Sequence, residues 1–187
     1  MATVLFRERG FDRVTVAEIA RAAGVSAMTV FNYFPRKEDL FLDRIPEAAD
    51  LCARAVRGRA AGEHPLTALR RLALELLDSG HPLSGVGDRY AGFWRIVLDS
   101  PTLRDRAREG VGELEDALAA ALAESAPEVH DPRLLAALAV AAYRTVYVTS
   151  AGRLLAGERA DAIGEDHRRR LTEAFDALER AFPAGPS

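Results

Sequence analysis

Apolar side chains recur at intervals of three and four residues along nearly every long stretch of this chain, and no stretch alternates apolar and polar residues. The first pattern is typical of amphipathic helices, whereas half-buried strands need the second. The periodicity therefore predicts an all-α fold. Prolines and glycines divide the sequence into about nine helices. Two helix starts are well defined, because Ser100-Pro101 and Asp131-Pro132 each place a capping side chain before a proline at the first helical position.

The two ends of the chain differ in character, which predicts two domains. Residues 1-44 hold five of the eight phenylalanines on very short helices, whereas the remainder is rich in alanine and leucine. We therefore predict an N-terminal three-helix domain over residues 1-44 and a larger helical domain over 45-187. A helix starting near Lys37 is expected to join them, with Pro46 kinking it or ending its first part. The helices expected after it lie near residues 65-79, 87-99, 101-125, 132-156 and 165-182.

Composition excludes several classes of protein. Hydrophobic residues make up 49% and charged residues 28% of the chain, so it can build a core and is not expected to be disordered. The formal net charge of -3 excludes a polycation that coats nucleic acid, and the single cysteine, Cys52, allows no internal disulfide. The longest apolar run, Leu134 to Tyr143, is ten residues, short of the roughly 18 that span a bilayer. Ala2 to Phe6 lack the basic residues of a secretory signal. We expect a cytoplasmic protein with no membrane partner.

One segment, Thr15 to Phe34, reads TVAEIARAAGVSAMTVFNYF and predicts two helices joined by a sharp turn. Thr15 and Glu18 form a T-x-x-E capping box, which indicates the start of the first helix. Gly24 can adopt the positive φ that a tight turn requires, and Ser26 can cap the helix that follows. The segment therefore predicts a helix-turn-helix.

The second helix of this motif has an inward and an outward face. Val30 and Phe34 are four residues apart and are expected to point inward, and Val25 is expected to fill the angle between the two helices. Small and polar residues fall largely on the outward arc: Ala27, Met28, Thr29, Asn32 and Tyr33. Such a helix has about the width of the major groove of DNA, where Asn32 can pair with adenine through two hydrogen bonds.

The segment from Leu5 to Phe41, LFRERGFDRVTVAEIARAAGVSAMTVFNYFPRKEDLF, resembles the TetR family of bacterial transcriptional regulators. The resemblance covers about a fifth of the chain, and the rest is similar only in its helical layout. It implies a helical ligand-binding and dimerisation domain after the helix-turn-helix. It also implies a ligand-responsive regulator, more commonly a repressor, that a small molecule releases from a palindromic operator.

The resemblance further implies which residues contact DNA. The base-facing positions are Ala27, Met28 and Asn32, with Thr29 close to either base or backbone. The positions that usually hold phosphates are Thr15, Ser26, Tyr33 and Lys37. Because Thr15, Ser26 and Lys37 also lie at or near expected helix N-termini, the helix dipole favours an anion beside them.

Two features depart from the family pattern. Phe31 stands where the family commonly has a tyrosine, so a hydroxyl contact to phosphate is missing and the ring is expected to serve mainly in packing. The chain also begins almost inside the first helix, and residues 1-44 carry seven basic and six acidic residues, a net charge of only +1. We therefore expect either a native start further upstream or DNA binding with a shallow dependence on salt.

Aromatic residues on two expected helices indicate a pocket for an apolar or amphipathic small molecule. The candidate lining residues are Tyr90, Phe93, Trp94 and Val97 on one helix, and Tyr143, Arg144 and Tyr147 on another. Each aromatic ring could equally fill the core. Arg144 lies in the middle of an apolar helix and needs a partner, which is either a ligand carboxylate or, more commonly, an internal acidic residue.

The 132-156 helix also predicts a homodimer. It is apolar on every side between residues 134 and 143, so it must be covered on every side. We expect one side to face the core and the other a second copy, in a C2 dimer through the last two helices, and the resemblance implies the same four-helix interface. Such a dimer would set two recognition helices roughly 34 to 36 Å apart.

The sequence gives little support for an enzyme. Its histidines lie on expected loops or helix ends without the spacing of a metal site: His64, His81, His130 and His167. Glu165-Asp166-His167 are interpreted as the acidic start of the last helix, and Arg168-Arg169-Arg170 as solvated surface. We expect no catalysis, cofactor or metal. The remaining alternative is a small-molecule sensor or interaction protein of the same fold that no longer binds a specific operator.

Overall fold

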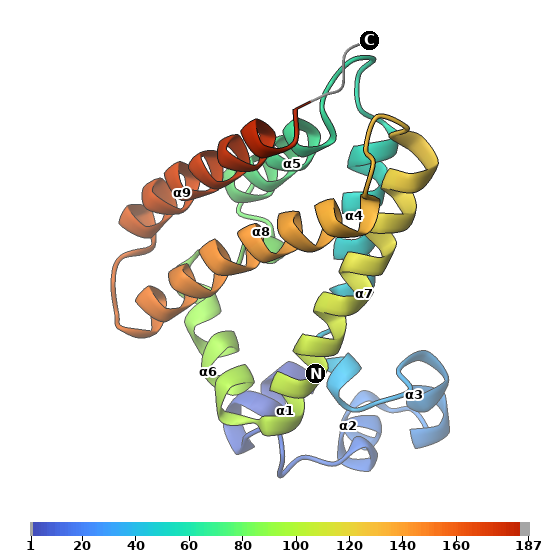
Figure 1. Ribbon diagram of the computed structural model, residues 1–187. Coiled ribbons are helices and arrows are strands. Elements are labelled where there is room, and N and C mark those ends of the chain that lie inside the picture. Colours follow the sequence, from blue (N-terminus) through green and yellow to red (C-terminus); the bar gives the residue numbers. More distant parts are fainter. Residues whose placement is uncertain (1, 184–187) are drawn as a thin grey trace. The chain divides into compact units, whose positions relative to one another are not determined.

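The computed structural model describes residues 2–183, and the regular structure in this range consists entirely of helices (Figure 1). Nine are α-helices and three are short 3-10 helices: α1 (Ala2–Arg9), α2 (Val16–Ala23), α3 (Ala27–Tyr33), η1 (Glu38–Leu40), α4 (Ile45–Arg57), α5 (Pro65–Asp78), η2 (Pro82–Ser84), η3 (Asp88–Tyr90), α6 (Ala91–Asp99), α7 (Pro101–Ser125), α8 (Pro132–Leu155) and α9 (Ala160–Ala181). The predicted all-α fold is therefore confirmed for the described range.

The helices divide into two compact units. The first contains the chain up to Asp43 together with Gly92–Gly110, and the second contains Arg44–Ala91 and the chain from Val111 onward. Most of α6 and the first ten residues of α7 therefore belong with the N-terminal helices, and α7 crosses from one unit to the other without interruption. The assignment of separate functions to residues 1-44 and 45-187 stays a prediction.

The core of the first unit is aromatic. Phe6, Phe11 and Phe41 are buried, and their ring centroids lie 4.8 Å (Phe6 to Phe11), 5.7 Å (Phe6 to Phe41) and 6.2 Å (Phe11 to Phe41) apart. Phe93 of α6 stacks on Phe41 at 5.1 Å, and α7 contributes the buried Leu103. Because helices as short as α1 and α2 bury few residues each, large rings supply the apolar area that this unit needs.

Polar contacts also hold residues 92–110 against the N-terminal segment. The Ser100 hydroxyl donates to the Asp12 carboxylate at 2.8 Å, and Arg106 Nε donates to Asp39 Oδ1 at 2.7 Å. The Arg106 side chain is largely buried, so water screens this ion pair only weakly. These contacts join segments far apart in the sequence, which explains why residues 92–110 form one unit with the first helices.

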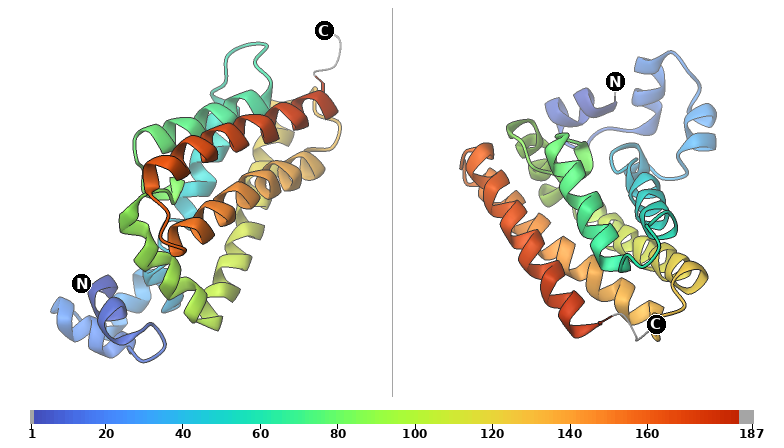
Figure 2. Two further views of the ribbon diagram at one scale, coloured as in Figure 1. Left: turned by 90° about the vertical axis from the view of Figure 1, so that its left-hand side faces the viewer. Right: turned by 90° about the horizontal axis from the view of Figure 1, so that it is seen from above.

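In the second unit α8 and α9 lie side by side, and α5 packs along α9 (Figures 1 and 2). The apolar faces of α5, α8 and α9 meet those of α4 and α7 in a single core. Fully buried members of this core are Leu122 of α7, Leu135 of α8 and Leu171 of α9. α4 packs against α5 and adds Val56. Each of these helices presents an apolar stripe to the core, as the spacing of three and four residues predicts.

α8 is long and apolar enough to cross a membrane by length and composition alone, although only 39% of its most apolar stretch is buried within this chain. It packs against α9, and two of its arginines, Arg133 and Arg153, form ion pairs within the unit. α8 is thus a core helix of the second unit. Two large apolar side chains on it, Leu134 and Val148, nevertheless remain exposed.

The helix expected to start near Lys37 is interrupted. η1 ends at Leu40, and α4 begins only at Ile45, with Pro46 in its first turn. Proline is favoured there, because its missing N–H would have no partner within the helix and its fixed φ suits the first turn. Pro46 therefore starts a new helix. The predicted kink is wrong, and the first part of the expected helix ends before Pro46, at Leu40.

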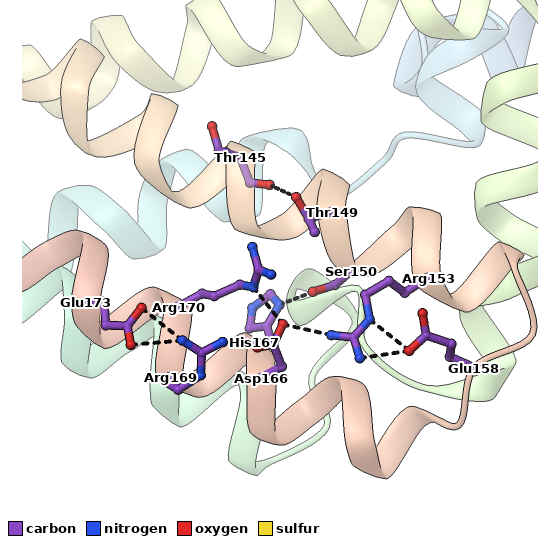
Figure 3. Close-up of polar contacts among 10 residues, drawn as sticks. All are labelled: Thr145, Thr149, Ser150, Arg153, Glu158, Asp166, His167, Arg169, Arg170 and Glu173. Atoms are coloured by element: carbon purple, nitrogen blue, oxygen red, sulfur yellow. Dashed lines mark hydrogen bonds and ion pairs between the residues drawn. The ribbon is translucent and has the colours of Figure 1, made fainter.

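The last helix begins at Ala160, five residues before its expected start, so Asp166 and His167 lie inside it (Figure 3). Asp166 accepts hydrogen bonds from Arg153 at 2.7 Å and from Arg170 at 2.6 Å, and it also pairs with Arg169. Burial raises the pKa of the Asp166 carboxyl, but the hydrogen bonds from Arg170 and Arg169 outweigh this effect and keep the pKa below its ordinary value. Asp166 thus links α8 to α9, and its interpretation as part of a helix start is wrong.

His167 is fully buried between α9 and α8, and not at a helix end as expected. Its Nδ1 lies 2.8 Å from the Ser150 hydroxyl of α8, and its Nε2 has no hydrogen-bond partner among the described residues (Figure 3). Burial lowers the pKa of the imidazole to about 4, although Asp166 acts in the opposite direction. The side chain is therefore neutral at physiological pH.

Candidate nucleic-acid interface and ligand cavity

The predicted helix-turn-helix is formed by α2, a turn at Gly24 and α3. The Thr15 N–H donates to Glu18 Oε2 at 2.8 Å and the Glu18 N–H donates to Thr15 Oγ1 at 3.3 Å, which completes the capping box. The Thr15 N–H and then the Thr15 hydroxyl, which both donate to Glu18 Oε2, act together with Arg9 to lower the pKa of Glu18 to about 2. Gly24 has a φ of 69°, and the Ser26 hydroxyl accepts from the Thr29 N–H at 3.0 Å. The local signals in the sequence thus act as predicted.

The outward face of α3 is open to solvent. Met28 and Tyr33 are 70% and 78% exposed, and Thr29 and Asn32 are exposed as well. Val30, on the opposite side of the helix, is buried and anchors α3 to its unit. The candidate base-facing residues therefore share one accessible surface, except that Ala27 is half-buried.

Two apolar side chains near α3 lie differently from expectation. Val25 is 44% exposed, so it does not fill the angle between the helices, and Phe31 is 47% exposed, so its ring is not mainly a packing element. In helices this short, few neighbours are available to cover residues beside the turn. Phe31 therefore adds to the accessible surface of α3.

Lys37 is directed inward, unlike the other candidate phosphate contacts. Its ammonium donates to the backbone carbonyls of Phe11 at 3.1 Å and Val14 at 3.2 Å, and it lies 4.3 Å from the centroid of the Phe11 ring. These carbonyls belong to the loop between α1 and α2. Lys37 thus holds this loop together, and only one of its three N–H groups is left for a phosphate.

A Lys37→Met variant is therefore expected to lose about 1–2 kcal/mol of stability even without DNA, because methionine keeps the apolar stem but leaves two carbonyls without their charged donor. Urea unfolding followed by circular dichroism measures this loss. Arg21→Met, which removes an exposed cation from α2, is the matched control and should change stability by less than about 0.5 kcal/mol. If the two variants are equally stable, Lys37 does not stabilise the loop, and a phosphate contact is its only remaining role.

A cavity of about 210 Å³ lies inside the second unit. Its wall is almost entirely apolar and comes from α4, α5, η2, α7, α8 and α9. Burial raises the pKa of the Cys52 thiol in this wall to about 11, so the thiol stays protonated. The Tyr143 hydroxyl donates to the Leu83 carbonyl at 2.9 Å, which holds η2 against α8. An apolar space of this kind suits a small apolar or amphipathic molecule.

Three of the seven candidate ligand residues, Tyr143, Arg144 and Tyr147, line this cavity. The other four lie elsewhere: Tyr90, Phe93, Trp94 and Val97. The last three are side chains of the first unit, where Val97 is buried in the aromatic core and Phe93 packs on both Phe41 and Trp94. Tyr90 packs beside Arg89 and Gly80. These four residues therefore do not line this cavity, and a ligand role for them stays a prediction.

Sequence comparison agrees with the architecture. Residues 1–43 match the family described as "Bacterial regulatory proteins, tetR family". TcmR of Streptomyces glaucescens, an HTH-type transcriptional regulator, is 31% identical to this chain over 153 residues, which cover 78% of this chain and 67% of TcmR. The chain belongs to the TetR family. It is a TetR-family transcriptional regulator, and the resemblance seen in the motif is confirmed.

Two further proteins are similar to nearly the whole chain. The nucleoid occlusion factor SlmA of Escherichia coli is 24% identical over 179 residues, which cover 95% of this chain and 86% of SlmA. FadR of Thermus thermophilus, a TetR-family repressor solved with lauroyl-CoA, is 27% identical, with a TM-score of 0.51 and coverage of 92% of this chain and 90% of FadR.

Most of the cavity wall of this TetR-family regulator was missed by sequence reasoning. Leu69, Leu72 and Leu76 of α5 line the cavity and repeat at intervals of three and four residues. That spacing reveals which face of α5 is turned inward. It carries no information on whether the inward face meets other side chains or an open space, because this depends on the size of residues on other helices.

Proposed function

We propose that this TetR-family regulator is a homodimeric repressor that a small molecule releases from a palindromic operator. The exposed face of α3 carries the proposal, because Met28, Asn32 and Tyr33 are accessible while Val30 anchors the helix from behind. In the proposed complex Asn32 reads base edges in the major groove, and Tyr33 and Ser26 contact phosphates.

Effector release is supported by the apolar cavity and by its walls. α4 contributes Cys52 and α7 contributes Val111 and Leu114. α7 continues from these residues into the unit that contains the helix-turn-helix. A ligand that repositions α4 and α7 therefore biases the orientation of α3. A coupling free energy of about 1–3 kcal/mol would weaken operator binding roughly 5- to 150-fold. FadR, which was solved with lauroyl-CoA, gives a precedent for a ligand with an apolar chain in this family.

Dimerisation is proposed to occur through α8 and α9. The exposed Leu134 and Val148 give α8 an apolar surface in addition to its core side, and such a surface is favourable to bury against a second copy. Two copies related by a two-fold axis would read two half-sites of one operator. The proposal places the protein in the cytoplasm with its DNA, and it assigns no catalytic step to any residue.

Operator recognition is tested by two substitutions with different expected effects. Asn32→Ala should change which base is preferred at one operator position, by about 1–3 kcal/mol. Tyr33→Ala should instead weaken binding to all sequences alike, because a phosphate contact carries no base information. Affinities are measured by fluorescence anisotropy with the DNA upstream of the gene for this protein and with single-base variants of that DNA. Comparing these affinities separates the two effects.

Asp99→Ala changes an exposed residue at the end of α6 and serves as the control in this experiment. It should leave both affinity and preference at the native level. If Asn32→Ala keeps the native order of preference among the DNA variants, α3 does not read bases through Asn32, and this assignment is wrong.

The second candidate is a sensor or interaction protein that has lost specific operator binding. It is favoured by the pairing of cations in the first unit, where Arg9 bonds Glu18 at 2.8 Å and Arg36 pairs with Glu109. Cations held in ion pairs release fewer counterions from DNA, so the logarithm of affinity should fall less steeply with the logarithm of salt concentration. Anisotropy at two salt concentrations decides between the candidates. Sequence preference that survives at high salt supports the repressor, whereas weak binding without preference supports the sensor.

A further inference from the structure

One charged side chain, Arg144, lines the otherwise uncharged wall of the cavity. It is the only charged residue among the described residues that line this space, and it is exposed to solvent, whereas the other lining residues are buried or half-buried. A side chain that both borders the cavity and contacts solvent marks the place where the cavity opens. Arg144 therefore lies at the mouth of the apolar cavity.

Arg144 has no hydrogen bond or ion pair within the described part of the chain. The other two arginines of α8 are paired, Arg133 with Asp116 at 3.0 Å and Arg153 with Asp166 at 2.7 Å. The internal acidic partner that sequence reasoning considered for Arg144 is thus not found among residues 2–183. All donors of this guanidinium remain available, in a planar arrangement that matches a carboxylate.

We infer that Arg144 binds the carboxylate of an effector whose apolar body fills the cavity. This inference rests on the proposed function, in which the cavity receives a small molecule. A single guanidinium balances a single negative charge, and no second cation lines the cavity among the described residues. A carboxylate therefore fits better than a phosphate monoester, which carries about two negative charges at neutral pH.

The size of the cavity limits the apolar body of this acid. An apolar cavity of about 150 Å³ accepts a benzene molecule. The cavity of about 210 Å³ therefore has room for one ring with a short side chain, or for an acyl chain of similar volume. The effector class assigned here is a compact aryl or acyl monocarboxylic acid, held at its charged end by Arg144 and enclosed by the leucines of α5 and α7.

The test compares 3-phenylpropionate with 3-phenylpropanamide, which has the same apolar body without the charge. Isothermal titration calorimetry on the full chain should show the acid binding at least roughly tenfold more tightly than the amide, since a charge-assisted pair outweighs a neutral hydrogen bond. In Arg144→Gln this preference should disappear, and Arg144→Lys should keep part of it. Arg133→Gln, on the same helix but outside the cavity, should keep all of it.

Several results would overturn the inference. Equal affinity of the native protein for acid and amide, or an unchanged preference in Arg144→Gln, would remove the role of Arg144 but leave the ligand cavity intact. Binding of neither probe would reject the compact acid as the effector class. Loss of the dimer in Arg144→Gln, measured by light scattering, would place Arg144 at a subunit interface. Operator binding is measured by anisotropy in the absence of any effector. A failure of the proposed repressor function would therefore be seen in that measurement and not in the calorimetry.

Discussion

A Gly85→Ala variant is expected to unfold about 5–15 °C below the native protein. Gly85 follows η2 with a φ of 64°, a conformation that costs alanine about 1 kcal/mol. A Cβ atom at this position would also lie 2.3 Å from Cε2 of the Tyr147 ring, so the ring must move. Displacing the half-buried ring adds about 1–3 kcal/mol, for a total loss of about 2–4 kcal/mol.

Gly157→Ala provides the matched control for this variant. Gly157 has a similar φ of 84°, but a Cβ there would meet nothing within 4 Å. It should therefore show only the backbone cost of about 1 kcal/mol. Thermal unfolding of both variants, and of Gly85→Ala combined with Tyr147→Leu, separates backbone strain from the clash. If Gly85→Ala loses no more stability than Gly157→Ala, the Tyr147 ring is not held in place and the clash does not operate.

Acidification from pH 7.5 to pH 5 is expected to cost the protein about 2 kcal/mol through His167 alone. The unfolded imidazole titrates near 6.5, whereas burial lowers the pKa of the folded one to about 4. Above pH 6.5 both states are neutral and the folded state has its full stability. Between pH 6.5 and 4 the unfolded state takes up a proton that the folded state excludes, so stability falls through this window.

His167→Gln should remove most of this pH dependence, because glutamine has no ionising group and can still reach the Ser150 hydroxyl. His130→Gln, at an exposed position, is the control. Asp166 lies beside His167, but its pKa is below the ordinary aspartate value, so it stays ionised across the window. Urea unfolding of the native protein and both variants at pH 7.5, 6 and 5 gives the three profiles. Parallel profiles for native and His167→Gln would mean that another group controls acid unfolding.

Local signals in the sequence predicted local structure well. Thr15, Glu18 and Gly24 act within a few residues of themselves, so the capping box and the turn follow from chemistry that needs no tertiary contact. The exposure of Asn32 and Tyr33 follows from helical periodicity in the same way. The family resemblance added the proposed roles of these residues toward DNA.

Predictions that depended on distant contacts were less successful. The same spacing of Phe93, Trp94 and Val97 suits a pocket wall or a core, and the choice depends on Phe41 and Leu103, which lie far away in sequence. Similarly, the last helix was expected from residue 165, but it begins at Ala160 and includes Gly164. Lys37 differs because its partners are backbone carbonyls, which no residue pattern reveals.

The passage of α7 from one compact unit to the other has a mechanical consequence. The division falls between Gly110 and Val111, and a second glycine, Gly112, follows within the same helix. Each glycine lowers helix stability by nearly 1 kcal/mol relative to alanine, so bending is easiest here. From this point to Pro101 the helix forms a lever arm of about 14 Å, at 1.5 Å per residue. A bend of about 10° at its fulcrum would displace the tip by about 2 Å.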